Sequence, residues 1–537
     1  MNRPPNTGGN SPPLTRQSGG GAFASVVLVE CCQGSDRSRL LKLVPVPSAW
    51  LLALAMSVLY VLILAYPVHL HRVGGFSDFY VRFAPDADRI AAGEFPQNTY
   101  NPPGYPVLLA LASPLTGDHF TSGKWMSLLA AGLIGVLIFC LVRRLFGPGP
   151  ALLAVPIVLL SHSFTTYSIT AMADVPFLCV CLGALLATTI DRPARWWPAI
   201  LGGLLSGAAY LIRYNGVFLL VPGLLGMLWR EDARTSGSKL GAVYLGSFLL
   251  TIASWGWLNY THHGSPVYST NYLDVVRAFR LDGGGRPFTS FADVVSRDPG
   301  RLAWGYAGNV GPTLVNGFGA SLALLPVGPL AAVGIVLSLV RHRRRPVILV
   351  LVGALTFVLL MSFTHWERRY HFFPLACYSG FAAFAVFQIG HAVGRILGSP
   401  MAARIVMTAL VLVVVIPSGG RAWDAVRISL KRQPIELLPA ARYLDSVAPP
   451  GATVMAVRAQ IAYLSRRQFR ELPNAGSVDE LRSILSERPP DYIVFDRWGR
   501  FRRSLTTLAK PDGSIPWLNP VFNDGAVVVY AVQLDRR

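Results

Sequence analysis

Three acidic residues lie in a short segment between two long apolar runs. Asp78, Asp86 and Asp88 follow the run 50–68 and precede the run 125–146. A chain that leaves one membrane span and enters the next would present these residues at the membrane surface. Because a carboxylate is costly to desolvate there, a chemical role is favoured over a solvated loop acid.

The acidic segment also has the pattern of a surface helix followed by a rigid turn. Its apolar residues recur every three to four positions, which suits a helix lying on the bilayer, at Phe79, Phe83, Ala87 and Ile90. Residues 100–106, Tyr-Asn-Pro-Pro-Gly-Tyr-Pro, predict a rigid turn, because proline fixes φ. The turn leads into another apolar stretch at 107–112.

A second dense group of polar residues occupies 364–371, Thr-His-Trp-Glu-Arg-Arg-Tyr-His, between two later apolar runs. One interpretation is an interfacial belt, in which tryptophan and tyrosine lie at headgroup depth and arginine side chains reach toward water. The belt accounts for the aromatic residues but not for the adjacent guanidiniums of Arg368 and Arg369. A functional site is therefore favoured for this segment.

Two further charged residues lie at the ends of predicted helices. Asp174 is in the first turn of a helix at 171–190, where an acid complements the helix dipole. Arg213 ends a helix at 197–213, where a cation stabilises the C-terminus. At an external membrane face, the Arg213 guanidinium could also bind a lipid phosphate through paired hydrogen bonds. Both roles stay open for Arg213.

The composition is that of a membrane protein with several spans. The chain has 537 residues, of which 52% are hydrophobic and 14% are charged, and its mean hydropathy is +0.44. Soluble domains have a charged fraction of roughly 25%. Short loops between apolar runs carry the net charge of +20, which indicates cytoplasmic loops and no nucleic-acid partner. The cysteines mostly fall within apolar runs and His262-His263 lacks further ligands, so neither disulfides nor a metal site is predicted.

The apolar runs predict about eleven membrane helices. They lie near 48–68, 124–146, 150–164, 171–190, 197–213, 215–229, 240–260, 313–340, 346–363, 370–392 and 402–418. With this count the basic loops fall on one side of the membrane. The N-terminus is therefore predicted in the cytoplasm and the C-terminus outside, with membrane lipids surrounding the helices.

This topology divides the chain into three parts. Residues 1–45, rich in Pro, Gly, Ser and Asn, are predicted to be a disordered cytoplasmic segment. Residues 46–420 form the membrane domain, with external loops at 69–123 and 261–312. Residues 421–537 form a small external α/β domain. The elements predicted outside the membrane are an amphipathic helix at Asn271–Leu281, strands at Thr453–Val457, Tyr492–Phe495 and Ala526–Val532, and a capping box at Ser477–Glu480.

The acidic segment resembles the first external loop of a known family. Ser77-Asp78-Phe79, a helix that ends at Ala92-Gly93, and the turn at 100–106 resemble this loop in the GT-C membrane glycosyltransferases. That family includes the lipid A aminoarabinose transferases and the protein O-mannosyltransferases. The Asp-x-Pro string at Asp174 and the Arg-Tyr-x-x-x-Pro string at Arg369 resemble two other external parts of the same family.

The resemblance implies a GT-C-like fold and an inverting sugar transfer on the external face of the cytoplasmic membrane. The implied donor is a sugar linked to polyprenyl phosphate, and the implied acceptor is a lipid, a glycan or a protein. Asp78 matches the position of the catalytic base. The implied substrate-binding residues, whose arginines would hold the departing phosphate, are Tyr105, Asp174, Arg213, Glu367, Arg368, Arg369 and Tyr370.

Two points stay open at this stage. Many family members have Asp-Glu or Asp-x-Asp where this chain has Asp78-Phe79, so a divalent cation is left open and no other cofactor is predicted. The alternative function is a transporter or flippase for a lipid-linked or anionic substrate. Transporters usually show internal repeats and charged residues at the bilayer midplane, and neither is clear in this sequence. A non-catalytic scaffold would give Asp78 and Arg369 no role.

The predicted topology can be tested by cysteine labelling. Asp479→Cys places a thiol in the C-terminal domain, which we expect outside the cell because the basic loops define the opposite face. A membrane-impermeant maleimide should label this variant in intact cells. Labelling only after lysis would contradict the predicted orientation.

Overall fold

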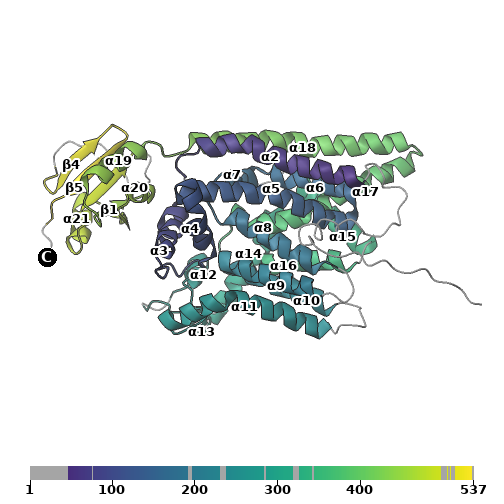
Figure 1. Cartoon of the computed structure of the whole chain (residues 1–537), viewed down its shortest axis with the longest axis horizontal. Coiled ribbons are helices and arrows are strands. Elements are labelled where there is room, and N and C mark those ends of the chain that lie inside the picture. The colour runs from purple at the N-terminus through teal and green to yellow at the C-terminus, as the bar shows by residue number, and fades with distance from the viewer. Residues whose placement is uncertain are drawn as a thin grey trace, which may run out of the picture.

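Long helices lie side by side through most of the chain, and a small sheet domain stands at one end of them (Figure 1). The predicted disordered segment 1–45 lies outside the described residues. The computed structural model describes residues 46–74, 76–190, 196–229, 237–282, 286–318, 326–341, 344–497, 505, 508 and 515–534.

All of the predicted membrane regions contain helices. These are α2 (Val46–Leu70), α5 (His119–Phe146), α6 (Pro148–Leu159), α7 (His162–Ser168), α8 (Asp174–Thr188), α9 (Trp197–Ile212), η2 (Tyr214–Leu219), α10 (Leu220–Leu228), α11 (Gly237–His263), α15 (Val327–Arg341), α16 (Arg345–Met361), α17 (Phe372–Ile396) and α18 (Pro400–Lys431). The predicted helix 150–164 is broken into α6 and α7, which bend by 68°. The predicted helix 313–340 contains the end of another helix, α14 (Pro299–Phe318), followed by α15.

The lengths and packing of these helices fit a polytopic membrane protein. Among the described residues, five helices are long and apolar enough to cross a membrane, and the bent pair α6 and α7 makes a sixth candidate. The span that contains α17 has 83% of its most apolar window buried, whereas α18 has 22% buried. Helix α17 is therefore central, and α18 lies at the edge with its apolar side chains exposed as lipid-facing residues are. The predicted helical fold is confirmed.

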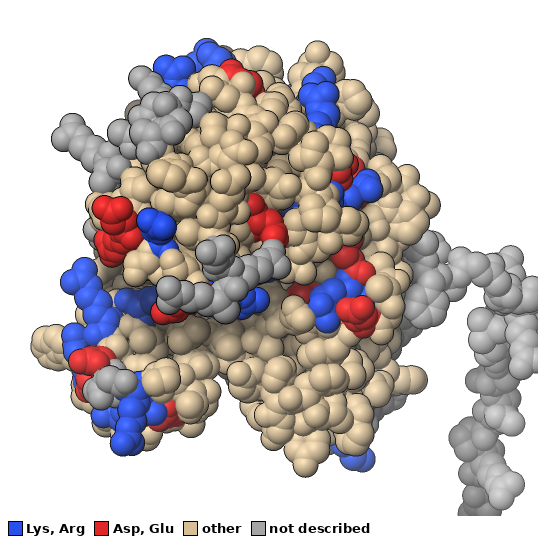
Figure 2. Space-filling view, turned by 90° about the vertical axis from the view of Figure 1, so that its left-hand side faces the viewer, with Lys and Arg blue, Asp and Glu red and all other residues tan. Residues whose placement is uncertain are grey.

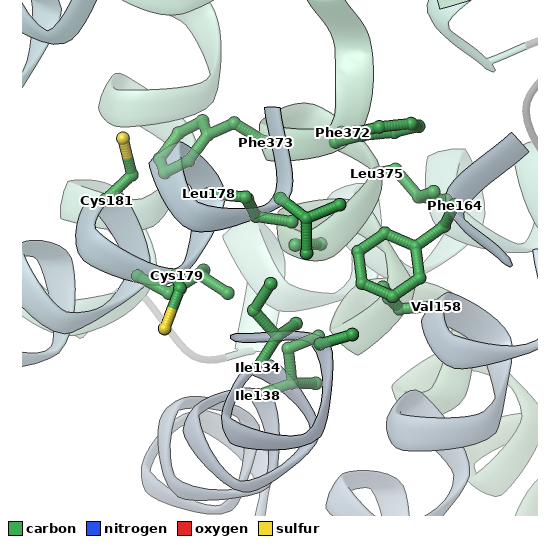
Figure 3. Close-up of a cluster of buried hydrophobic side chains, with 14 of the residues drawn as sticks. Ile134, Ile138, Val158, Phe164, Leu178, Cys179, Cys181, Phe372, Phe373 and Leu375 are labelled. Carbon is green, nitrogen blue, oxygen red and sulfur yellow. The ribbon is translucent and has the colours of Figure 1, made fainter. Parts of the chain in front are cut away.

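The core of the membrane domain forms where five helices meet. Figure 3 shows the apolar side chains that α5, α6, α7, α8 and α17 contribute to it. The labelled residues are Ile134, Ile138, Val158, Phe164, Leu178, Cys179, Cys181, Phe372, Phe373 and Leu375. Four buried cysteines of the membrane domain, Cys140, Cys179, Cys181 and Cys377, are free thiols. This packing fixes the relative positions of the helix ends above it.

The first of the two loops predicted to be external folds, as expected, into a helix followed by a turn. A π-helical segment, η1 (Phe79–Phe83), continues into α3 (Ala84–Ala91), and the apolar residues Phe79, Phe83 and Ala87 are buried. After the proline-rich turn comes α4 (Gly104–Thr116). A Cβ at Gly104 would overlap the backbone carbonyl of Leu211 in α9, so this glycine allows the loop to pack directly on the end of that helix.

The second external loop has three helices and its own small core. They are α12 (Tyr272–Phe279), α13 (Phe291–Arg297) and α14. Tyr272, Val275, Phe288 and Val294 are among the side chains buried between them. Helix α12 confirms the amphipathic helix predicted in this loop.

The C-terminal domain is a five-stranded sheet flanked by short helices. The strands are β1 (Thr453–Ala456), β2 (Gln468–Glu471), β3 (Tyr492–Asp496), β4 (Leu518–Asn523) and β5 (Val527–Val532), in the order β2-β1-β3-β5-β4. The helices are α19 (Leu437–Val447), α20 (Gln460–Leu464) and α21 (Val478–Ser486). Strand β1 is parallel to β2 and β3, whereas β5 is antiparallel to β3 and β4.

The sequence predicted the three central strands of this domain but not its two edge strands. The three predicted strands correspond to β1, β3 and β5, and Ser477 caps α21 by accepting a hydrogen bond from the backbone N–H of Glu480 at 3.1 Å. The edge strands β2 and β4 were not predicted. Their sequences, Gln-Phe-Arg-Glu and Leu-Asn-Pro-Val-Phe-Asn, are short or interrupted by proline and lack a buried run.

The contact between α15 and α17 depends on a glycine. A Cβ at Gly334 would overlap the backbone carbonyl oxygen of Phe381, whereas a Cβ at Gly246 in α11 would meet nothing within 4 Å. We expect Gly334→Ala to lower the free energy of unfolding by about 1–3 kcal/mol, because the helices must move apart. Gly246→Ala should be neutral or stabilising by up to about 1 kcal/mol. Thermal unfolding in detergent compares the two variants, and equal melting temperatures would contradict the close contact.

Asp86 is a buried acid that supports the first loop. Its Oδ1 accepts hydrogen bonds from the backbone N–H groups of Gln97 (3.0 Å) and Asn98 (3.3 Å). Burial raises the pKa of Asp86 from 3.8 to about 6, although these two hydrogen bonds and the charge of Arg89 oppose the rise. The folded protein therefore binds this proton more tightly than the unfolded chain does, and the stability contributed by the protonated group is lost as the pH rises from about 4 to about 6.

Asp86→Asn should therefore be more stable than the wild type at pH 8, by about 1–3 kcal/mol, because asparagine keeps the acceptor oxygen without the buried charge. The gain should shrink as the pH falls toward 4. Unfolding midpoints of both proteins across this pH range test the effect. A gain that does not change with pH, or a loss of stability at pH 8, would contradict it.

Candidate functional site

Several elements bring charged residues together at one end of the membrane domain. Asp78 lies just before η1, Asp174 begins α8, Arg213 follows α9, and Glu367 precedes the short helix η3 (Arg368–His371). Because the core beneath holds α8, α9 and α17 together, residues far apart in the chain meet at one end of the helices. Six of the eight predicted site residues belong to this group, namely Asp78, Asp174, Arg213, Glu367, Arg369 and Tyr370.

Arg369 is the centre of the group. Its Nη1 donates a hydrogen bond to Asp78 Oδ2 at 3.0 Å, and its Nε lies 2.5 Å from Glu367 Oε2. The side chain of Arg369 is 10% exposed, whereas that of Asp78 is 28% exposed. Arg82 approaches the other oxygen of Asp78 at 3.6 Å. Asp78 is therefore paired with cations and still reachable from outside.

A second ion pair lies beside the first. Arg213 donates a hydrogen bond to Asp174, whose carboxylate is buried and has one oxygen, Oδ2, without a hydrogen-bond partner among the described residues. The ring of Tyr370 links the two pairs, because the guanidinium carbons of Arg213 and Arg369 each lie 5.2 Å from its centroid. Asp174 thus occupies the helix start that its sequence position predicts and also faces an arginine.

Within the described part of the chain, the other two predicted residues form no ion pair or hydrogen bond with this group. Tyr105 is fully buried and packs edge-on against Phe83 with ring centroids 5.0 Å apart, so it supports the loop from below. Arg368 is exposed, while its neighbour Arg369 turns toward the acids. Both residues lie in η3, a 3₁₀-helix, in which adjacent residues point about 120° apart, and this explains why only one of them faces the group.

Sequence reasoning did not identify several residues that complete the site. Tyr100 donates a hydrogen bond from its hydroxyl to Asp274 Oδ2, and the Arg82 guanidinium carbon lies 3.9 Å from the centroid of the Tyr100 ring. His365 Nε2 lies 3.0 Å from Glu367 Oε1. Asp274 comes from α12 of the second loop, so both external loops contribute. Its position on the predicted amphipathic helix was visible in the sequence, but its partners were not.

The environment shifts the pKa values of these added groups. Burial raises the pKa of Asp274, although the nearby charges of His365, Arg277 and Arg82 oppose the rise. The hydrogen bond to Glu367 raises the pKa of His365. For Glu367, burial acts to raise the pKa, but the hydrogen bond with His365 and the charge of Arg369 outweigh it and hold the pKa below its usual range. Glu367 is therefore an ionised anchor for Arg369.

Among the described residues, no group of three or more His, Cys, Asp or Glu side chains could hold a metal ion. Asp78 and Glu367 are both engaged by Arg369.

Charge on the exterior of this end is mixed. Figure 2 shows the end of the molecule that carries the sheet domain, where acidic and basic side chains lie interspersed among other residues. Among the described residues, this view shows no large surface on which all charged side chains have the same sign. Residues 421–537 contain 18 basic and 12 acidic residues, and such a surplus more often keeps a domain soluble than it binds anionic lipid.

Comparison with known proteins identifies related folds. Residues 100–257 match the family model described as dolichyl-phosphate-mannose-protein mannosyltransferase. ArnT from Cupriavidus metallidurans, in a structure with bound undecaprenyl phosphate, is similar over 91% of this chain and 98% of its own, with 13% identity and a TM-score of 0.57. No curated protein matches the chain in sequence.

Oligosaccharyltransferases of Archaeoglobus fulgidus are also similar in structure. One, in complex with zinc and sulfate, is similar over 89% of this chain and 73% of its own, with 12% identity and a TM-score of 0.59. AglB, in complex with an inhibitory peptide and a dolichol-phosphate, is similar over 83% of this chain and 69% of its own, with 12% identity and a TM-score of 0.56. The chain therefore has the fold of the GT-C membrane glycosyltransferases, which confirms the resemblance found in its sequence motifs.

Proposed function

We propose that the protein transfers a sugar, with inversion, from a polyprenyl-phosphate donor to an acceptor outside the cytoplasmic membrane. The observation that carries this proposal is the direct hydrogen bond between Asp78 and Arg369 at the external helix ends. It places a carboxylate that can accept a proton next to a guanidinium that can hold a phosphate. Sugar transfer from a lipid phosphate requires both groups, a base for the acceptor and a cation for the departing phosphate.

In this mechanism, Asp78 acts as the general base. It removes the proton from an acceptor hydroxyl while the hydroxyl oxygen attacks the anomeric carbon of the sugar. The bond between that carbon and the phosphate oxygen breaks, and the electron pair leaves with the polyprenyl phosphate. Attack from the face opposite to the phosphate inverts the configuration at the anomeric carbon.

Arg369 holds the phosphate as its negative charge grows. Its guanidinium presents several N–H groups in one plane, which suits bidentate binding of phosphate. Glu367 keeps the guanidinium in place, and Arg213 lies across the Tyr370 ring as a second cation. The sugar is then positioned between these cations and Asp78.

Donor binding would also release the base. Without a donor, Arg369 neutralises Asp78. A phosphate competes for the same guanidinium, so its binding would take Arg369 away from the Asp78 carboxylate. Binding of the donor therefore prepares Asp78 for proton transfer.

Related structures support a lipid-phosphate donor. ArnT has been captured with undecaprenyl phosphate, and AglB with a dolichol-phosphate. The alternative function, a transporter or flippase, would call for charged residues near the bilayer midplane. The charged residues described above gather at one end of the helices instead, so transfer is the function that we propose. The acceptor is a lipid, a glycan or a protein, and residues outside this charged group would select it.

Asp78→Asn should abolish transfer without weakening donor binding. Removing a general base lowers the rate by about 10²–10⁴-fold. The assay follows release of polyprenyl phosphate from the lipid-linked sugar that accumulates in cells lacking the protein. Asp88→Asn is the control, because Asp88 is an exposed acid of the same loop and pairs with His119 at 2.8 Å. Near wild-type turnover in Asp78→Asn would exclude Asp78 as the base.

Arg369→Lys should weaken binding of polyprenyl phosphate by about tenfold or more, since lysine keeps the charge but loses the planar set of donors. Arg368→Lys is the matched control and should bind as the wild type does, because Arg368 is exposed. Titration of polyprenyl phosphate against both purified variants measures the difference. An interfacial anchor would tolerate lysine at either position, so equal affinities would remove Arg369 from the donor site.

A further inference from the structure

We infer that the C-terminal domain positions the loop that carries Asp78, through Gln460 and Tyr463. Both residues belong to α20 of the sheet domain, and both contact the first external loop of the membrane domain. Only the expected change in reaction rate rests on the proposed role of Asp78 as the base. The contacts themselves belong to the structure whatever the reaction is.

The first contact is a buried hydrogen bond. Gln460 is 2% exposed, and its Nε2 donates to the carbonyl oxygen of Gly74 at 3.0 Å. The N–H of Gly74 in turn donates to the hydroxyl of Tyr80 at 2.8 Å. A Cβ at Gly74 would lie 2.9 Å from the Phe120 ring, so the backbone here is tightly enclosed. Gln460 is thereby connected to both sides of Asp78 in the chain.

The second contact is an aromatic cluster. The ring of Tyr463 lies edge-on to Tyr80 at 5.2 Å and to Phe79 at 6.1 Å between centroids. On the membrane side, Phe120 of α5 packs against the same two rings at 6.0 Å and 5.6 Å. The first two residues after Asp78 are therefore clamped between the sheet domain and a membrane helix.

The segment just before the loop is held in the same way. Gln433, which follows α18, accepts hydrogen bonds through Oε1 from the backbone N–H groups of Arg72 (2.6 Å) and Val73 (3.4 Å). From the membrane side, Lys124 Nζ donates to the carbonyl oxygens of Val68, at 3.0 Å, and His71. These bonds fix where α2 ends and where the loop begins.

These restraints matter because Asp78 is at the start of η1, and its direction follows the backbone of the first turn. A general base must point at the proton that it removes, and a displacement of about 1 Å can cost about 10²-fold in rate. Loss of the clamp should therefore slow the chemical step. It should leave donor affinity largely intact, because Arg369 and Glu367 lie on a different segment. If the C-terminal domain were only tethered to the membrane domain, loss of these contacts would change neither the chemical step nor the donor affinity.

The test uses the full-length protein with Tyr463→Ala and Gln460→Ala. Tyr463→Phe is the conservative variant, since the contacts described involve the ring. Matched controls in the same domain are Tyr443→Ala, whose ring packs against Phe522 at 5.3 Å, and Gln468→Ala, which is exposed on β2. Hydrogen–deuterium exchange of the peptide that covers residues 72–83 reports on the loop, and steady-state kinetics report on the reaction.

We expect Tyr463→Ala and Gln460→Ala to speed exchange in this peptide about tenfold or more, and to lower kcat about 10- to 100-fold with the donor KM within about twofold. Tyr463→Phe and both controls should match the wild type. Unchanged exchange in the two alanine variants, or equal acceleration in the controls, would overturn the inference. Faster exchange with an unchanged kcat would also overturn it. If the wild type transfers no sugar, the proposed function fails, and the exchange measurement still decides whether the domain orders the loop.

Discussion

The structure depends on pairing charges where the helices leave the membrane. An isolated carboxylate or guanidinium is costly to hold in such a place, and the cost falls only when opposite charges meet with good geometry. Asp78 with Arg369, and Asp174 with Arg213, satisfy this condition. The ends of α8, α9 and η3 must therefore lie close together, and the apolar core beneath them, which α5, α8 and α17 help to build, keeps them there.

The same pairing explains how a resting site can be stable and still reactive. Arg369 has two carboxylate partners, Glu367 and Asp78, and only Asp78 is the base in the proposed mechanism. A phosphate that replaces Asp78 as a partner leaves Glu367 in place. In this proposal Arg369 stays paired with Glu367 while the phosphate replaces Asp78. Only the Asp78 carboxylate then changes its partner. The sheet domain contacts the loop that carries Asp78 through Gln460 and Tyr463, which is why we infer that it helps to set where Asp78 points.

Much of this arrangement could be predicted from the sequence. The helices, the acidic loop and the grouping of Asp78 with Arg369 followed from apolar runs, charge positions and short motifs. The partners that join different loops could not be predicted, because Tyr100 with Asp274, and Gln460 with Gly74, depend on how distant segments pack. Tyr105 and Arg368 show the same limit. Their residue types suit a binding site, but packing turns Tyr105 into the core and leaves Arg368 exposed.

The most direct test is an experimental structure of the protein with polyprenyl phosphate bound. The account predicts the phosphate at hydrogen-bond distance from the Arg369 guanidinium, with Arg213 nearby and with the bond between Arg369 and Asp78 lengthened or broken. The Asp78 carboxylate should then face the space beside the phosphate. A phosphate bound at the opposite end of the helices, or one bound while the pair between Asp78 and Arg369 stays intact, would contradict it.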